Sequence, residues 1–146
     1  MIERRDVLKA AAALVVLNGI ANAEETGHEH ASGAEHSPQH DLSRAIAGCL
    51  AEGNICMQHC LVALATGDTT LAECSKTVRD MLAICGATQT LVASNSPRTK
   101  AAVQLCVDAC TDCEAACRKH AEKHAVCKAC ADACAATIKA GRAFLA

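Results

Sequence analysis

The sequence predicts an all-α protein, an antiparallel four-helix bundle with a cysteine-lined core. Alanine is abundant, β-branched runs are short and no segment alternates with a period of two, which disfavours strands. The 146 residues include 12 Cys but one Phe and no Trp or Tyr, so aromatic side chains cannot fill the core. The cysteines recur at helical spacings, and a free cysteine packs as a small apolar residue.

End signals predict the first two helices. Ser37-Pro38 offers an N-cap followed by a proline at the first helical position, and Gly67 follows the end of this helix near residue 66. Thr70 and Glu73 match a capping box, in which each side chain satisfies a backbone N–H that the helix leaves unpaired. The second helix then runs to about residue 94.

One further start signal and one change of phase divide the rest of the chain. Ser96-Pro97 repeats the cap-plus-proline start, and the third helix runs to about Lys119. The cysteine phase of this helix is lost by Cys127, which lies about 80° out at 100° per residue. We therefore predict a turn at 120–124 and a fourth helix from about 125 to 140, ended by Gly141. Four helices with short connections pack as an antiparallel bundle.

The first residues predict export. Arg4-Arg5 precedes the apolar run Ala10–Leu17, and Ala21–Ala23 gives an A-x-A cleavage pattern, so residues 1–23 are predicted to be a signal peptide. Its apolar run is too short to span a membrane. The paired arginines, with the Leu-Lys pair after them, resemble a twin-arginine signal. The alternative is a Sec signal that carries two arginines. Either signal predicts an exported, periplasmic protein.

Residues 24–40 are predicted to form a flexible arm, because Gly, Ser and Pro recur there without hydrophobic periodicity. The arm holds four histidines, which either bind metal weakly or are simply solvated: His28, His30, His36 and His40. The helical bundle is then predicted to occupy residues 41–146. A formal net charge of −2 gives no basic surface for nucleic acid, and no membrane span is expected in the mature chain.

Each predicted helix carries its cysteines on one face. Separations of 3, 4, 7 and 11 residues recur within the helices, and these spacings return to the same face. The charged residues lie on the opposite faces, so the cysteine stripes are predicted to point inward. The predicted metal ligands are these twelve residues: Cys49, Cys56, Cys60, Cys74, Cys85, Cys106, Cys110, Cys113, Cys117, Cys127, Cys130 and Cys134.

The chemistry of these stripes favours Cu(I). Soft thiolates select Cu(I), and thiolates shared between ions bring the ratio near one Cu⁺ per thiolate, with a ceiling of roughly a dozen ions. The interior then stays near neutral, which a buried site requires. Structural zinc needs isolated tetrahedral sites, and iron–sulfur clusters need a loop-borne cysteine run. Metallothionein-like sequestration of another soft metal stays an alternative.

A disulfide-bonded structural or partner-binding bundle is the second hypothesis. An even number of cysteines and the predicted export favour it, whereas cysteines three or four apart in one helix do not readily reach disulfide geometry. The sequence does not predict an enzyme. His59 and Cys60 could suggest a base and a nucleophile, but adjacent helical residues point about 100° apart.

A family resemblance rests on the cysteine pattern, above all on Cys56-x₃-Cys60, Cys85-Gly86-Ala87 and Cys127-x₂-Cys130-x₃-Cys134. This pattern resembles the bacterial four-helix-bundle copper storage proteins of the exported, twin-arginine type, from about residue 42 to the C-terminus. The resemblance implies storage of many Cu(I) ions by thiolates inside the bundle, and often a homotetramer. A copper-delivery or copper-receiving protein is the expected partner.

The resemblance also covers His59, which it implies is a further metal ligand. The alternative is a surface histidine, because His59 lies about 80° from the cysteine stripe. Exported members carry methionines at the mouth of the bundle, and residues 63–71 contain none. Met81 is in phase with Cys74 and is either core or a thioether ligand. His120 and His124 are expected to be solvated in the opposite turn.

Overall fold

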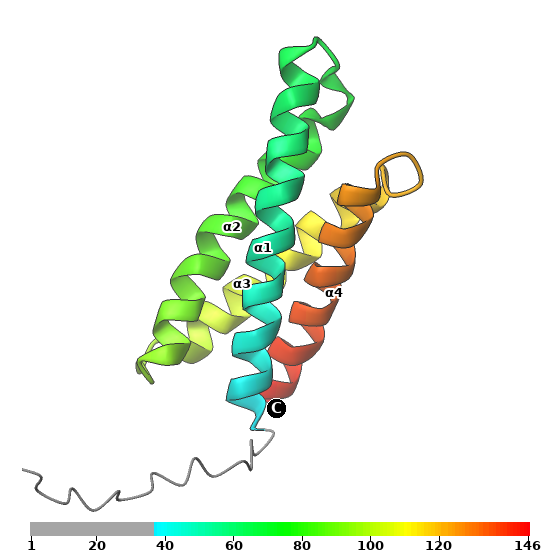
Figure 1. Ribbon diagram of the computed structural model, residues 1–146. Coiled ribbons are helices and arrows are strands. Elements are labelled where there is room, and N and C mark those ends of the chain that lie inside the picture. Colours follow the sequence, from blue (N-terminus) through cyan, green and yellow to red (C-terminus); the bar gives the residue numbers. More distant parts are fainter. Residues whose placement is uncertain (1–36) are drawn as a thin grey trace, which may run out of the picture. The chain divides into compact units, whose positions relative to one another are not determined.

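The computed structural model describes residues 37–146, which form four helices joined by short turns (Figure 1). The elements are α1 (Pro38–Ala65), the 3₁₀ turn η2 (Thr69–Leu71), α2 (Ala72–Ala93), α3 (Thr99–Arg118) and α4 (Ala125–Leu145). These residues contain no strand, and the predicted all-α bundle is confirmed. The predicted signal peptide and most of the predicted arm lie outside the described residues, while residues 38–40 already belong to α1.

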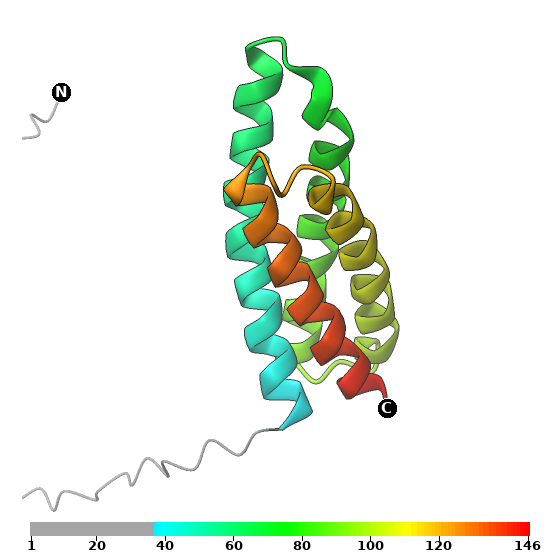
Figure 2. The same cartoon turned by 90° about the vertical axis from the view of Figure 1, so that its right-hand side faces the viewer.

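The helices pack in a ring. Each contacts the next along the chain, and α4 closes the ring against α1. The start of α1 and the C-terminus lie at one end, and the α1–α2 hairpin extends past the α3–α4 turn at the other (Figures 1 and 2). Among residues 37–146, no helix combines the length and apolar character that crossing a membrane requires.

The helix starts follow the sequence signals in part. Ser37 caps α1 as predicted, because its Oγ accepts a hydrogen bond from the backbone N–H of His40 at 3.2 Å. The capping box predicted at Thr70 does not form. Asp68 takes the cap instead, accepting hydrogen bonds from the backbone N–H of Thr70 at 2.9 Å and from its hydroxyl at 2.7 Å. The Thr70 hydroxyl is therefore already engaged outside the helix.

Two other predicted boundaries were wrong. The third helix begins at Thr99 rather than at Pro97, since Ser96 forms a tight turn in which its Oγ accepts from the N–H of Arg98. The fourth helix passes through Gly141 to Leu145. Gly141 is buried against α3, where a Cβ atom would lie 2.6 Å from Cγ2 of Val107. This glycine therefore allows close helix packing and does not end the helix.

The interior has two chemically different parts. Near the start of α1 and the C-terminus, it is filled by aliphatic side chains, including Leu42, Ile46, Val92, Val103 and Ile138. Towards the other end the cysteines replace them, over about 16 Å along α3 at 1.5 Å per residue. The ion pairs stay outside, as between Arg118 and Asp132. The bundle thus encloses a thiol-filled segment closed at one end by an aliphatic core.

Candidate metal centre

All twelve cysteines are buried and free, with at most 1% of any cysteine exposed. They come from all four helices and face the bundle axis, as the helical spacing predicted. The closest pairs join different helices: Cys85 and Cys106 have sulfurs 3.2 Å apart, and Cys74 and Cys117 have sulfurs 3.3 Å apart. A disulfide bond is about 2.05 Å long, so these are contacts between thiols and not bridges.

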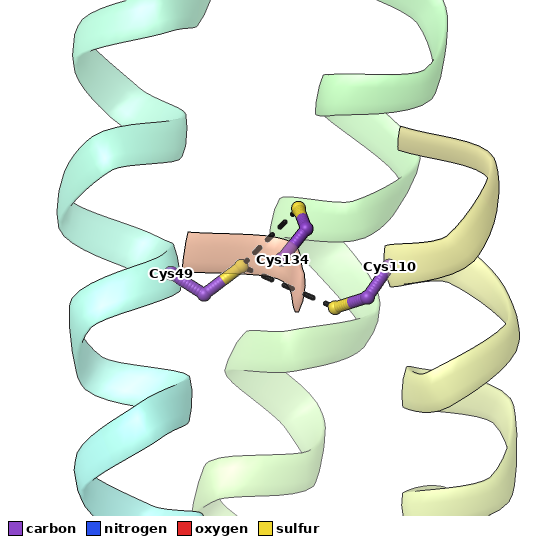
Figure 3. A group of neighbouring side chains, drawn as sticks. All are labelled: Cys49, Cys110 and Cys134. Carbon is purple, nitrogen blue, oxygen red and sulfur yellow. Dashed lines mark hydrogen bonds between the residues drawn. The ribbon is translucent and has the colours of Figure 1, made fainter. Parts of the chain in front are cut away.

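The sulfurs gather into groups of three. In five triplets among residues 37–146, all three sulfurs lie within 4.8 Å of one another. The triplets are Cys85–Cys106–Cys110, Cys49–Cys110–Cys134, Cys113–Cys130–Cys134, Cys56–Cys117–Cys130 and Cys56–Cys74–Cys127. Figure 3 shows the second of these, with the three sulfurs converging from α1, α3 and α4. Each triplet draws its sulfurs from two or three helices.

The triplets form an unbroken series. Each shares one cysteine with the next, in the order Cys110, Cys134, Cys130 and Cys56. A thiolate has more than one lone pair, so a shared cysteine can bind two soft cations at once. The geometry therefore offers a row of adjoining sites rather than the isolated tetrahedral sites of structural zinc.

Burial and neighbouring thiols set the protonation of this segment. Burial raises the pKa of Cys60 to about 12 and that of Cys127 to about 11, so both are protonated at neutral pH. Hydrogen bonds from Cys117 and then Cys56 lower the pKa of Cys74 to about 3. The pKa of Cys117 is raised in turn by its hydrogen bonds to other thiols, first among them Cys113. The interior can hold a few thiolates only where neighbouring thiols donate to them.

Cys60 stands at the margin of this arrangement. It is fully buried, but it is the one cysteine in the described chain that belongs to none of the triplets. It follows Cys56 by one helical turn and is the last thiol of α1 before the α1–α2 turn. Of the predicted cysteine ligands, the structure therefore brings eleven into triplets and leaves Cys60 beside their end.

A histidine pair lies at the same end. Nε2 of His59 is 3.0 Å from Nδ1 of His124, within hydrogen-bonding distance, and the ring centroids are 4.9 Å apart. The ring of His120 is 6.4 Å from that of His124, and all three histidines are half-buried. The prediction that His124 lies in a turn at the opposite end from His59 was wrong. Because α1 and α4 run in opposite directions, the C-terminal end of α1, which carries His59, lies at the same end of the bundle as the start of α4, which follows His124.

A second sulfur donor was left undecided by the sequence. Met81 is fully buried, and its Sδ lies 3.4 Å from Sγ of Cys49, whereas Met57 is half-buried at the edge of the core. The sequence signal for Met81 was its position seven residues after Cys74, on the same face of the helix. Periodicity could place Met81 inside the bundle, but it could not show which sulfur it meets.

The family model for copper storage proteins matches residues 35–146, which is most of the chain. The chain belongs to the copper storage protein family. Among solved structures, the Cu(I)-bound copper storage protein BsCsp3 is 28% identical, with a TM-score of 0.69, covering 75% of this chain and 100% of its own. The copper storage protein Ccsp from Streptomyces lividans, loaded with 10 copper equivalents, is 25% identical, with a TM-score of 0.69, covering 78% and 88%.

These relatives correct the predicted location. A third similar structure is a cytosolic copper storage protein from Streptomyces lividans with five coppers, 27% identical, with a TM-score of 0.63, covering 74% of this chain and 94% of its own. The prediction of an exported, periplasmic protein is therefore wrong. That prediction rested on a local pattern in residues 1–23, which lie outside the described residues. A comparison with curated protein sequences finds no match.

Proposed function

We propose that this chain stores multiple Cu(I) ions on the cysteine thiolates inside its bundle, without catalysing a reaction. The observation that carries the proposal is the series of five triplets joined by shared cysteines. Soft, bridging thiolates in a dry interior suit Cu(I) better than zinc. Membership of the copper storage family and the likeness to Cu(I)-bound BsCsp3 support this reading.

Charge balance sets the capacity that we propose. Each Cu⁺ replaces one thiol proton, so the interior gains no net charge as it fills, and the desolvation of an uncompensated thiolate is avoided. Twelve buried cysteines then give a ceiling of roughly one ion per thiol, or about a dozen. Because the thiols already converge from four helices, the bundle can fill without changing its fold.

Anaerobic titration of the reduced chain with Cu(I), against a strong Cu(I) chelator, tests the storage proposal. We expect a plateau at about 10 to 12 ions per chain. A plateau at one or two ions would contradict storage and indicate a chaperone. A count of free thiols on protein isolated without added reductant tests the disulfide hypothesis. That hypothesis predicts few free thiols, whereas storage predicts many.

We further propose that copper enters at the histidine end and that His59 is a ligand there. The aliphatic core blocks the other end, and the pair of His59 and His124 lies beside the last thiols of the segment. The matched control is His40, an exposed histidine at the far end of α1. His59→Ala should slow Cu(I) loading several-fold at an unchanged plateau, while His40→Ala should not. Equal loading rates in the two variants would contradict this role.

Self-association, as a homotetramer, is the last part of the proposal. Ile55 and Val62 are 52% and 54% exposed, and they lie seven residues apart on one face of α1. Light scattering after size exclusion should give the mass of four chains for the wild type. Ile55→Glu should reduce that mass, whereas Leu105→Glu, an equally exposed position on α3, should not. A copper-delivery or copper-receiving protein would meet each bundle at the end where His59 and His124 lie.

A further inference from the structure

In the middle of the thiol-filled segment, the helices do not contribute cysteines equally. There α3 and α4 place cysteines at successive turns, but α1 places Gly53 between Cys49 and Cys56. On α2, the positions between its two cysteines hold Val78 and Met81. Within residues 50–55 of α1 and 75–84 of α2, which separate these cysteines, Met81 is the only buried sulfur.

The packing around Met81 leaves room for its side chain. Its Sδ lies 3.4 Å from Sγ of Cys49, which is itself 3.6 Å from Sγ of Cys134 and 4.0 Å from Sγ of Cys110. A Cβ atom at Gly53 would lie 2.6 Å from Cε of Met81. The missing side chain at Gly53 is therefore what allows the thioether to reach the Cys49 triplet.

The two sulfurs that meet here are both soft donors. The Cys49 thiol donates a hydrogen bond to the thioether at 3.4 Å, and a thioether is a weak acceptor. A soft cation that takes the place of this proton would be bound by both sulfurs. Thioethers, like thiolates, select Cu(I).

We propose that Sδ of Met81 is a Cu(I) ligand inside the bundle, acting together with the thiolate of Cys49. The inference rests on the proposed storage function and adds to the twelve cysteines a donor of a different kind. A thioether carries no charge, so it completes the coordination of an ion without changing the charge balance. Its removal should therefore leave the number of bound ions unchanged.

Selenium offers a direct test, because the chain has only three methionines, Met1, Met57 and Met81. Replacement of all three by selenomethionine, followed by Cu(I) loading and X-ray absorption at the selenium edge, should show a selenium–copper scattering path. Met81→Leu, which preserves volume, should abolish that path. The matched control Met57→Leu should keep it. The copper content of each sample should be the same.

The outcomes separate this inference from the function on which it rests. A chain that binds about a dozen Cu(I) ions without a selenium–copper path would overturn the role of Met81 and leave storage intact. A path that persists in Met81→Leu, or disappears in Met57→Leu, would also overturn it. A chain that binds one or two ions would overturn both proposals. The wild-type measurement needs no variant, so a poorly folding Met81→Leu protein would not remove the test.

Discussion

Gly53→Ala and Gly48→Ala add the same methyl group to the same helix, the first at a buried position and the second at an exposed one. Both positions lie inside α1, so each alanine should gain about 1 kcal/mol of helix propensity over glycine. A Cβ atom at the exposed Gly48 meets nothing within 4 Å, and Gly48→Ala should therefore stabilise the protein. At Gly53 the Cβ atom would lie 2.6 Å from Cε of Met81 and 2.9 Å from Cδ2 of Leu82.

Overpacking of this kind destabilises a core by about 1–3 kcal/mol. Both variants share the gain in helix propensity, so Gly53→Ala should be less stable than Gly48→Ala by about 1–3 kcal/mol. Urea unfolding of the reduced, metal-free protein, followed by circular dichroism, measures this difference in the free energy of unfolding. The two variants should share one m-value, because the surface exposed on unfolding is almost the same.

A double-mutant cycle assigns the effect to Met81. In the Met81→Ala background the closest contact is gone, so Gly53→Ala should be less destabilising there than in the wild type, by about 1 kcal/mol or more. Gly48→Ala should have the same effect in both backgrounds. Stabilities of Gly53→Ala and Gly48→Ala that agree within about 0.5 kcal/mol would refute the packing argument.

Three further predictions concern copper. Cys110 belongs to two triplets and Cys60 to none. Cys110→Ala should therefore lower the Cu(I) plateau by about two ions, and Cys60→Ala by at most about one. Equal losses of bound Cu(I) in the two variants would contradict the role of the shared cysteines. Burial raises the pKa of Cys60 to about 12 and of Cys127 to about 11, whereas hydrogen bonds from Cys117 and Cys56 lower that of Cys74 to about 3. Loading at pH 7 should therefore release protons, at less than one per ion, and should weaken as pH falls. Titration in weakly buffered solution measures that release, and an absence of protons would mean that the thiols were already ionised. Far-ultraviolet circular dichroism should give similar helicity with and without copper, because the free bundle is already packed; a largely unfolded metal-free chain would instead indicate a fold that depends on metal.

The fold could be predicted because its signals are local. Cysteine spacings of 3, 4, 7 and 11 depend only on the 3.6-residue helical period, and the structure buries all twelve cysteines as that period requires. Ser37-Pro38 starts α1 for the same reason, since the cap and its N–H partner are three residues apart. The errors arose where a neighbour decides the outcome. Asp68 competes with the capping box at Thr70, and Val107 explains the glycine at position 141.

The sequence by itself determined a helical chain with inward-facing thiols and a chemistry suited to Cu(I). Only the tertiary structure decided which sulfurs meet, placing Cys110 in two triplets, Cys60 in none and Met81 against Cys49. It also paired His59 with His124, residues 65 positions apart. Helical periodicity fixes the face on which a side chain lies. It does not fix the axial shift or the rotation of one helix against the next, and those two quantities set every distance between sulfurs on different helices.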